Sequence, residues 1–171
     1  MSIIRRPPDL TERLAFREMT PDDLDDMAAL LGDSEVMRYY PRPKTRAEAV
    51  QWISWNRHGY REHGHGLWLI TLRSTGEFIG NCGLTLQNVE NVIHAEVGYL
   101  VRTKHQGNGY ATEAATACRN HARDALKLDR LISIINPDNV PSQRVATKIG
   151  MVFEREALYR DRPVRIYATE L

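Results

Sequence analysis

The segment 95–127 constrains the fold of this chain more than any other. An apolar stretch that ends at Val101 runs into the turn His105–Gly109, with two glycines in three positions, and a helical pattern begins at Tyr110. Small residues in such a turn let several backbone N–H groups face one point. The first turn of a helix adds unpaired N–H groups and the positive end of its dipole. The sequence therefore predicts a strand, turn and helix that together bind an anion such as a phosphate.

The turn alone does not identify the ligand. In a dinucleotide-binding fingerprint the third glycine would stand at position 112, where this chain has Thr112. An acid does follow about twenty residues on, at Asp129, but it precedes the next strand instead of ending it. The Lys-Ser/Thr pair of a Walker A loop is absent. A turn that serves only the path of the chain explains Gly107-Asn108-Gly109 equally well.

Three further helices are predicted from capping residues and apolar periodicity. Thr20 before Pro21 is typical of a helix start, and Thr45 with Glu48 forms a capping box. A short helix follows Asn139, a preferred capping residue. Period-two patterns and turn signals predict strands at 12–17, 66–72, 77–86, 95–101, 130–135, 151–155 and 164–169. This order implies an α/β fold with a mixed sheet and helices on its faces.

Composition limits the class of protein. With 171 residues, of which 42% are hydrophobic and 26% charged, the chain suits one folded domain over 1–171. A formal net charge of +1 does not favour a nucleic-acid or membrane partner. No apolar run approaches the roughly 20 residues that span a bilayer. Positions 1–9 lack the apolar stretch of a signal peptide, so a cytoplasmic location is expected.

Cysteines and histidines form no pattern typical of a metal site. Cys82 and Cys118 lie far apart among small or apolar residues, and we interpret both as core residues. His58, His63 and His65 are close together, but no further ligand is evident, and we interpret them as part of a solvated turn. We therefore expect no metal.

Four stretches of the chain occur in an order known from one protein family. They are Leu14–Arg17 before an acid-rich helix, Phe78–Leu84, Glu96–Tyr99 running into Gly107–Ala114, and Asn139–Met151. The third includes Gln106-x-x-Gly109-x-Ala111, which matches a Gln/Arg-x-x-Gly-x-Gly/Ala motif. With these stretches the chain resembles the GNAT superfamily of N-acetyltransferases, and most closely its branch of ribosomal-protein N-terminal acetyltransferases, the RimJ/RimL type.

The resemblance implies a GNAT-like α/β (α+β) single domain. Its mixed, mostly antiparallel sheet would have about seven strands, splayed at the cofactor site and flanked by about four helices. It also implies acetyl-CoA as co-substrate, with the pantetheine arm beside the central strand and the pyrophosphate on the amides of the glycine turn. Asn139 would bond the pantetheine, or serve as a helix cap alone. The positions implied for binding acetyl-CoA are Tyr99, Leu100, Val101, Gln106, Gly107, Asn108, Gly109, Tyr110, Ala111, Thr112, Asn139 and Ser142.

Glu96 is the candidate general base. It lies on the predicted central strand, on the face of Gly98 and Leu100, where a carboxylate is costly to bury without a partner or a task. A carboxylate in a partly dry site can take the proton that an attacking amine loses, directly or through water. A structural glutamate paired with a neighbouring arginine is equally compatible with the sequence.

The residue that would protonate the leaving thiolate differs from the family pattern. Most members use a tyrosine seven residues after the helix asparagine, where this chain has Ala146. In the RimJ/RimL branch a serine three residues after the asparagine is thought to serve, and Ser142 matches it. Alternatively, the Ser142 hydroxyl bonds only the backbone of the first helical turn.

The acceptor is expected to be a primary amine. The best candidate is a protein or peptide N-terminal α-amine, because its pKa near 8 lies below that of lysine. Tyr39, Tyr40 and Trp55 either line the acceptor cleft or belong to the core. The alternatives are a small amine such as an antibiotic or polyamine, a non-catalytic acyl-CoA-binding domain, and a nucleotide-dependent oxidoreductase. Either a monomer or a homodimer is expected.

Overall fold

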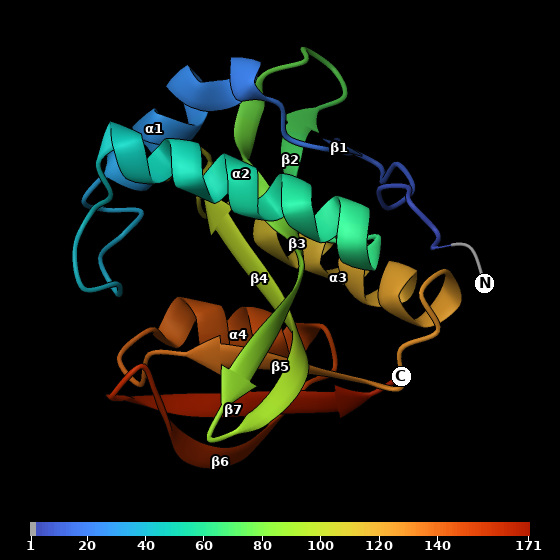
Figure 1. The fold of residues 1–171 in the computed structure, drawn as a ribbon, viewed down its shortest axis with the longest axis vertical. Helices are drawn as coiled ribbons and strands as arrows, with labels where there is room; N and C mark the ends of the chain where they lie inside the picture. Colours follow the sequence, from blue (N-terminus) through green and yellow to red (C-terminus); the bar gives the residue numbers. More distant parts are fainter. Residues whose placement is uncertain (1–2) are drawn as a thin grey trace.

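The computed structural model describes residues 3–171, within which seven strands form one sheet in the order β1-β2-β3-β4-β5-β7-β6 (Figure 1). The strands are β1 (Leu14–Arg17), β2 (Leu67–Leu72), β3 (Phe78–Val89), β4 (Val92–Val101), β5 (Arg130–Ile135), β6 (Val152–Tyr159) and β7 (Arg162–Glu170). The helices are α1 (Leu24–Gly32), α2 (Arg46–His63), α3 (Tyr110–Asp124) and α4 (Val140–Lys148), with short 3-10 turns at Pro21–Asp23 and Thr103–His105. The predicted α/β fold class is confirmed.

Strands β4 and β5 separate at the centre of the sheet. They are the parallel pair of an otherwise antiparallel sheet, and the described chain registers them at a single pair, Glu96 with Ile132. The β3–β4 ladder, in contrast, is regular along its whole length, from Gly80–Val101 to Val89–Val92. The splay expected from the resemblance is therefore present, and it arises without a bulge in β4.

Side-chain caps define the helix starts. Thr45 and Glu48 form the predicted capping box of α2, with Glu48 N–H donating to Thr45 Oγ1 at 3.2 Å and Thr45 N–H donating to Glu48 Oε2 at 2.7 Å. Asn139 caps α4, because its Oδ1 accepts from the Ser142 N–H at 3.1 Å. Gly64, with φ of +77°, ends α2 in the left-handed conformation that favours glycine.

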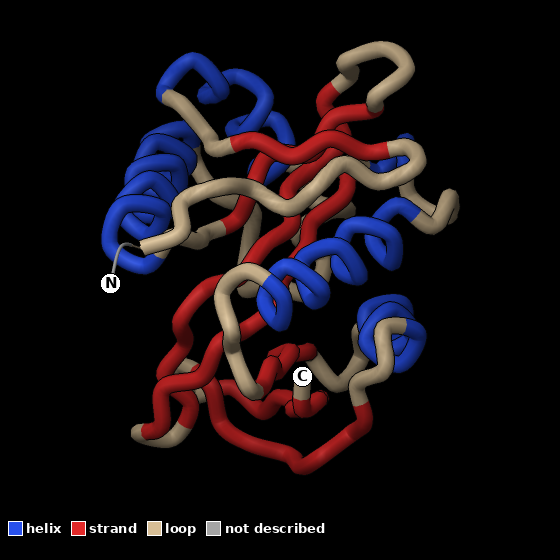
Figure 2. Tube along the Cα trace, turned by 90° about the vertical axis from the view of Figure 1, so that its right-hand side faces the viewer, coloured by secondary structure: helices blue, strands red, loops and turns tan. Residues whose placement is uncertain are grey.

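Two apolar cores lie on opposite sides of the sheet. In Figure 2, α1 and α2 lie to the left of the strands and α3 and α4 to the right. Met27, Leu31 and Ile53 fill the core under α1 and α2, whereas Trp68 and Leu84 belong to the core under α3. Besides His121, the buried face of α3 is made of small residues, which let the helix lie close to the sheet: Ala114, Ala115, Cys118 and Ala122. Cys82 and Cys118 are both fully buried here, as predicted.

Several boundaries differ from the sequence prediction. Strand β4 begins at Val92 instead of Ala95, because Glu90 and Asn91 take up left-handed φ angles of 50° and 70° and make a tight turn. The polar hairpin tip is held by β6, where the Leu158 N–H donates to Glu90 Oε1 at 3.2 Å. His65 is buried instead of solvated, with Nδ1 2.8 Å from the Leu84 carbonyl oxygen.

No helix within residues 3–171 is long and apolar enough to cross a membrane. The same residues contain no group of three or more His, Cys, Asp or Glu side chains placed to hold a metal ion.

Candidate active site

A cleft of about 1400 Å³ follows the line where β4 and β5 diverge. One end is bordered by the glycine turn, the start of α3 and α4, and the other by the α1–α2 loop and the β6–β7 turn. The cleft brings together nearly all site residues predicted from the sequence: Tyr39, Tyr40, Trp55, Glu96, Tyr99, Leu100, Val101, Gln106, Gly107, Gly109, Tyr110, Ala111, Thr112, Asn139 and Ser142. Asn108 is not among its lining residues.

The backbone of β4 turns alternate residues toward the splay. The Val97 carbonyl oxygen accepts from Ser133 Oγ on β5 at 2.9 Å, and the Val101 carbonyl oxygen accepts from Gln106 Nε2 at 3.0 Å. Because strand residues alternate in direction, the N–H and C=O of Tyr99 face the same side, where β5 has moved away. Leu100 differs: its Cα pairs with Asn81 of β3 and its side chain is buried in the core under α1 and α2.

The glycine turn delivers a helix start to the cleft. Gly107 and Gly109 have φ angles of +79° and +81°, a conformation that favours glycine. Gly109 precedes α3 with no side-chain cap, so the first amides of the helix face the cleft without an intrahelical partner. Asn108 instead shapes the turn, with Nδ2 donating to the His105 and Gln106 carbonyl oxygens.

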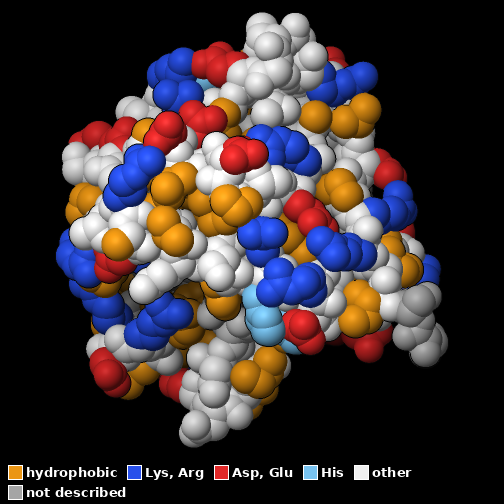
Figure 3. Space-filling view, turned by 45° about the horizontal axis from the view of Figure 1, so that its top comes forward, with side chains coloured by type: hydrophobic (Ala, Val, Ile, Leu, Met, Phe, Trp, Pro, Cys, Tyr) orange, Lys and Arg blue, Asp and Glu red, His pale blue; other side chains and the backbone are white. Residues whose placement is uncertain are grey.

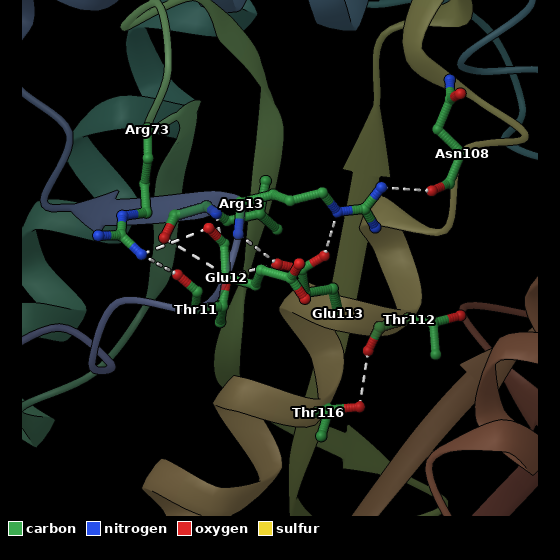
Figure 4. A network of polar contacts seen from close by, with 9 residues as sticks. Thr11, Glu12, Arg13, Arg73, Asn108, Thr112, Glu113 and Thr116 are labelled. Carbon is green, nitrogen blue, oxygen red and sulfur yellow. Dashed lines mark hydrogen bonds and ion pairs between the residues drawn. The ribbon is translucent and has the colours of Figure 1, made fainter.

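An ion-paired carboxylate sits beside this helix start (Figure 4). Glu113, in the first turn of α3, accepts from Arg13 Nε at 2.7 Å and from Thr11 Oγ1 at 2.7 Å. Partial burial alone would raise the pKa of Glu113, but these hydrogen bonds outweigh it and the pKa is lowered. Arg13 Nη1 also donates to the Asn108 carbonyl oxygen at 2.9 Å. Arg13 therefore both neutralises Glu113 and fixes the turn, a role that no local sequence signal indicates.

Two basic residues on α4 were missed at the sequence level. Arg144 and Lys148 both line the cleft and are exposed. They are four residues apart and so share one face of the helix. This spacing of two basic residues could have indicated a basic helix face from the sequence alone. Together with the α3 amides, they give positive charge suited to a polyphosphate to the end of the cleft at the glycine turn. We call this end the donor end and the opposite end the acceptor end.

Glu96 lies at the apex of the splay. Its Oε2 accepts from the Ile134 N–H at 3.1 Å, which satisfies a β5 amide that has lost its strand partner. Burial raises the pKa of Glu96 to about 7, although hydrogen bonds from Ile134 and Thr85 and the charge of Arg160 oppose the rise. Within residues 3–171 no Lys or Arg forms an ion pair with Glu96. The described residues therefore do not form the Glu96–arginine pair that the sequence left open as an alternative.

Ser142 and Tyr99 meet across the cleft. The Tyr99 hydroxyl donates to the Ser142 carbonyl oxygen at 2.9 Å and lies 2.8 Å from Ser142 Oγ. Burial raises the pKa of Tyr99, and the hydrogen bond with Ser142 partly offsets it. Ala146 is fully buried in the core under α3, so the position of the usual family tyrosine does not face the cleft.

Aromatic side chains line the opposite end. Tyr40 and Trp55 are 45% and 44% exposed, which places them at the mouth of the cleft instead of in the core. Burial of the Tyr40 hydroxyl, together with the charges of Glu96 and Tyr159, raises its pKa. Tyr159 lines the same end, with its hydroxyl donating to Gln87 Oε1 at 2.6 Å.

Comparison with known proteins identifies the family. Residues 13–152 match the family model described as acetyltransferase (GNAT) domain. This chain belongs to the GNAT acetyltransferases. This GNAT enzyme is 35% identical to the uncharacterized protein YkkB of Bacillus subtilis over 159 residues, covering 92% of each chain. It is 31% identical to the uncharacterized N-acetyltransferase p20 of Bacillus licheniformis, covering 88% of this chain and 84% of p20.

Solved structures share the fold of this N-acetyltransferase. An acetyltransferase from Agrobacterium tumefaciens superposes with a TM-score of 0.85 at 28% identity, covering 99% of this chain and 97% of the other. At lower identity the likeness concerns the fold alone. RimL, a ribosomal L7/L12 α-N-protein acetyltransferase in complex with coenzyme A, gives a TM-score of 0.78 at 19% identity over 99% and 98% of the two chains. A spermidine N-acetyltransferase from Vibrio cholerae, in complex with CoA and spermine, gives 0.72 at 16% over 94% and 96%.

Proposed function

We propose that this enzyme transfers the acetyl group of acetyl-CoA to the N-terminal α-amine of a peptide or protein. The observation that carries the proposal is Glu96 at the apex of the β4–β5 splay, with a pKa near neutrality, between a polyphosphate-type site and an aromatic cleft. A base with such a pKa is ionised at the pH where an α-amine begins to lose its proton.

The residues of the donor end fit acetyl-CoA. The unpaired backbone groups of Tyr99 lie where a pantetheine arm can add to β4 as an extra strand. The amides from Tyr110 to Thr112, with Arg144 and Lys148, suit the pyrophosphate. Bound there, acetyl-CoA supplies the thioester. RimL and the spermidine acetyltransferase were solved with coenzyme A, which supports the same assignment here.

Three groups take part in the proposed reaction: the Glu96 carboxylate, the Tyr99 backbone N–H and the Ser142 hydroxyl. Glu96 takes the proton of the attacking amine, directly or through water, and holds the Ile134 amide meanwhile. The freed Tyr99 N–H faces the splay and is suited to donate to the thioester oxygen as negative charge develops there. Ser142 Oγ passes a proton to the departing sulfur and takes one back from the Tyr99 hydroxyl 2.8 Å away, which solvent then reprotonates.

The acceptor end favours a peptide. Tyr39, Tyr40 and Trp55 line it. Tyr40 and Trp55 are each nearly half exposed, so they can contact an extended chain that enters from solvent. An α-amine needs less help from a base than a lysine amine, because its pKa near 8 lies below the lysine pKa of about 10.4. RimL acts on a protein α-amine, whereas the spermidine enzyme acts on a small amine.

A thiol-release assay over an amine panel tests this function. Short peptides with free N-termini should release coenzyme A thiol, while matched N-acetylated peptides that keep a lysine should release much less. Gly109→Asp should weaken acetyl-CoA binding at least tenfold, because it places a negative charge at the helix start, whereas Gly109→Asn tolerates the left-handed φ and serves as the uncharged control. Thiol release only with polyamines or aminoglycosides would refute the peptide acceptor.

A further inference from the structure

The acceptor end of the cleft contains an excess of basic side chains. Five line it, from the α1–α2 loop, the β6–β7 turn and the start of β7: Arg38, Arg42, Lys44, Arg160 and Arg162. Two are neutralised locally, because Arg38 pairs with Glu35 at 2.6 Å and Arg42 pairs with Glu48 at 2.7 Å. Lys44 lies over the ring of Trp52, with Nζ 5.6 Å from its centroid.

Arg160 and Arg162 are different. Neither forms an ion pair with any residue between 3 and 171, and both are exposed. Two lining carboxylates lack an ion-pair partner within the same residues: Glu96, the proposed base, and Asp138, which precedes α4 beside the donor site. The two arginines thus bring to the cleft positive charge that no ion pair within residues 3–171 neutralises.

The fold holds these arginines at the cleft. Arg160 and Asp161 have left-handed φ angles of 50° and 61°, so β6 and β7 are joined by a tight two-residue turn. The Arg160 guanidinium lies 5.1 Å from the ring centroid of Tyr159, whose hydroxyl is bound to Gln87 on β3. In Figure 1 the β6–β7 turn and the α1–α2 loop lie at the left of the view, and both line the cleft.

The excess is local to the cleft. The whole chain has a formal net charge of +1, and on the face seen in Figure 3 basic and acidic side chains are intermixed. Unpaired guanidinium groups bind carboxylates through charge-assisted hydrogen bonds, and they repel a second cation on the same substrate. An acceptor with several amines, such as a polyamine or an aminoglycoside, brings that repulsion with it.

We propose that the acceptor of this enzyme carries a carboxylate close to its reactive amine, and that Arg160 and Arg162 bind that carboxylate. The inference rests on the proposed acetyl transfer to an amine. Two sources share this chemistry: an acidic side chain in the first residues of a peptide, and the α-carboxylate of a free amino acid. Arg160 and Arg162 are then residues that determine acceptor specificity.

The test compares acceptors that differ only in charge. Three hexapeptides with the same sequence except for Asp, Asn or Lys at the second position, free aspartate, and spermidine are assayed with acetyl-CoA by thiol release. The Asp peptide should give a kcat/KM roughly tenfold above the Lys peptide, mainly through KM, and the preference should shrink with added salt. Activity of free aspartate near that of the Asp peptide would assign the amino-acid source, and its absence the peptide source.

The double variant Arg160→Asn/Arg162→Gln is the decisive protein. Asn tolerates the left-handed turn position, so the hairpin should be retained, and a melting curve checks this. The Asp:Lys ratio should fall toward one, while Arg57→Gln, an exposed arginine on α2 outside the cleft, should leave it unchanged. An unchanged ratio in the double variant, or wild-type enzyme that uses all three peptides equally, overturns this inference and leaves acetyl transfer intact. No turnover with any amine would overturn the proposed function itself.

Discussion

At the scale of single residues, Glu96 combines two features that a structural glutamate lacks. It faces a cleft large enough for substrates, and burial holds its pKa near 7 with no ion-pair partner in residues 3–171. Its Oε2 accepts from the Ile134 N–H, and an ionised carboxylate keeps further lone pairs on which it can take a proton. The same burial that would make a structural carboxylate costly adjusts this one to its task.

Glu96→Gln should lower turnover about a hundredfold, with acetyl-CoA affinity unchanged, because the amide can still accept from Ile134 but cannot take a proton. Wild-type kcat/KM should rise with pH through about 7 as Glu96 ionises, and the variant should lose this limb. The deficit should shrink above pH 8, where an α-amine is already neutral in solution. A variant with wild-type activity at pH 7 would show that another group removes the proton.

A stability measurement gives independent evidence for the same pKa. Because the folded-state pKa of Glu96 is raised, its contribution to stability is complete below the unfolded pKa and is lost as pH rises through about 7. The melting temperature of wild type relative to Glu96→Gln should therefore fall between pH 5 and pH 8. A constant difference would contradict the raised pKa.

Ser142 and Tyr99 should act as one unit. Asn139 already caps α4, so Ser142→Ala should reduce turnover more than donor binding and change the melting temperature little. Tyr99→Phe removes the hydroxyl 2.8 Å from Ser142 Oγ and should also lower turnover. If the hydroxyls form one proton path, the double variant should be no slower than the slower single variant. Additive losses would show that the two hydroxyls act independently, and a lower melting temperature with full turnover would make Ser142 a structural residue.

At the scale of elements, the sequence predicted what is encoded locally. Capping at Thr45 and Asn139 needs only neighbours three residues away, and both caps are as expected. The turn from β4 into α3 is likewise contiguous, which is why most of the residues that line this end of the cleft could be named beforehand. Boundaries failed where tertiary contacts extend an element, as in the hairpin whose Glu90 is held by β6.

Several of the missed residues come from distant elements. Arg160 lies in the β6–β7 turn and Arg162 begins β7, and only the sheet order, which puts this hairpin beyond β5, brings them to the cleft. Arg13 lies 100 residues from Glu113, and no periodicity links positions so far apart. Asn108 shows the opposite limit, because the motif includes its position but only the structure shows its side chain turned toward the backbone of its own turn.

At the scale of the whole molecule, the two ends of the cleft depend on long-range closure. On the acceptor side, the β3–β4 hairpin reaches β6, where Arg155 Nη1 donates to Glu90 Oε2 at 2.7 Å. Beneath this contact lies a third small core, which joins Val89 of the hairpin to residues of β5, β6 and β7: Ile132, Ala157, Val164, Ile166 and Ala168. The acceptor wall is therefore built by segments from both halves of the chain.

On the donor side, the start of the chain controls the charge at the glycine turn. Removing Arg13 would leave the Glu113 carboxylate without its ion-pair partner near the proposed phosphate site, with its side chain only 18% exposed. Arg13→Gln should therefore weaken acetyl-CoA binding roughly tenfold, by repulsion and by loosening the turn at Asn108. Arg73→Gln is the matched control, because Arg73 bonds the neighbouring Thr11 carbonyl but not Glu113 (Figure 4).

Adding Glu113→Gln separates the two causes of the Arg13→Gln loss. If repulsion dominates, Arg13→Gln/Glu113→Gln should bind acetyl-CoA more tightly than Arg13→Gln alone, since the uncompensated charge is gone. If the clamp on the Asn108 carbonyl dominates, the double variant should bind no better. We expect partial recovery, because Arg13 serves both functions: it pairs with Glu113 and also donates to the turn. Isothermal titration with acetyl-CoA, alongside melting curves of each variant, measures both effects. Wild-type affinity in Arg13→Gln would show that the α3 helix start holds the phosphates without help from the N-terminal segment.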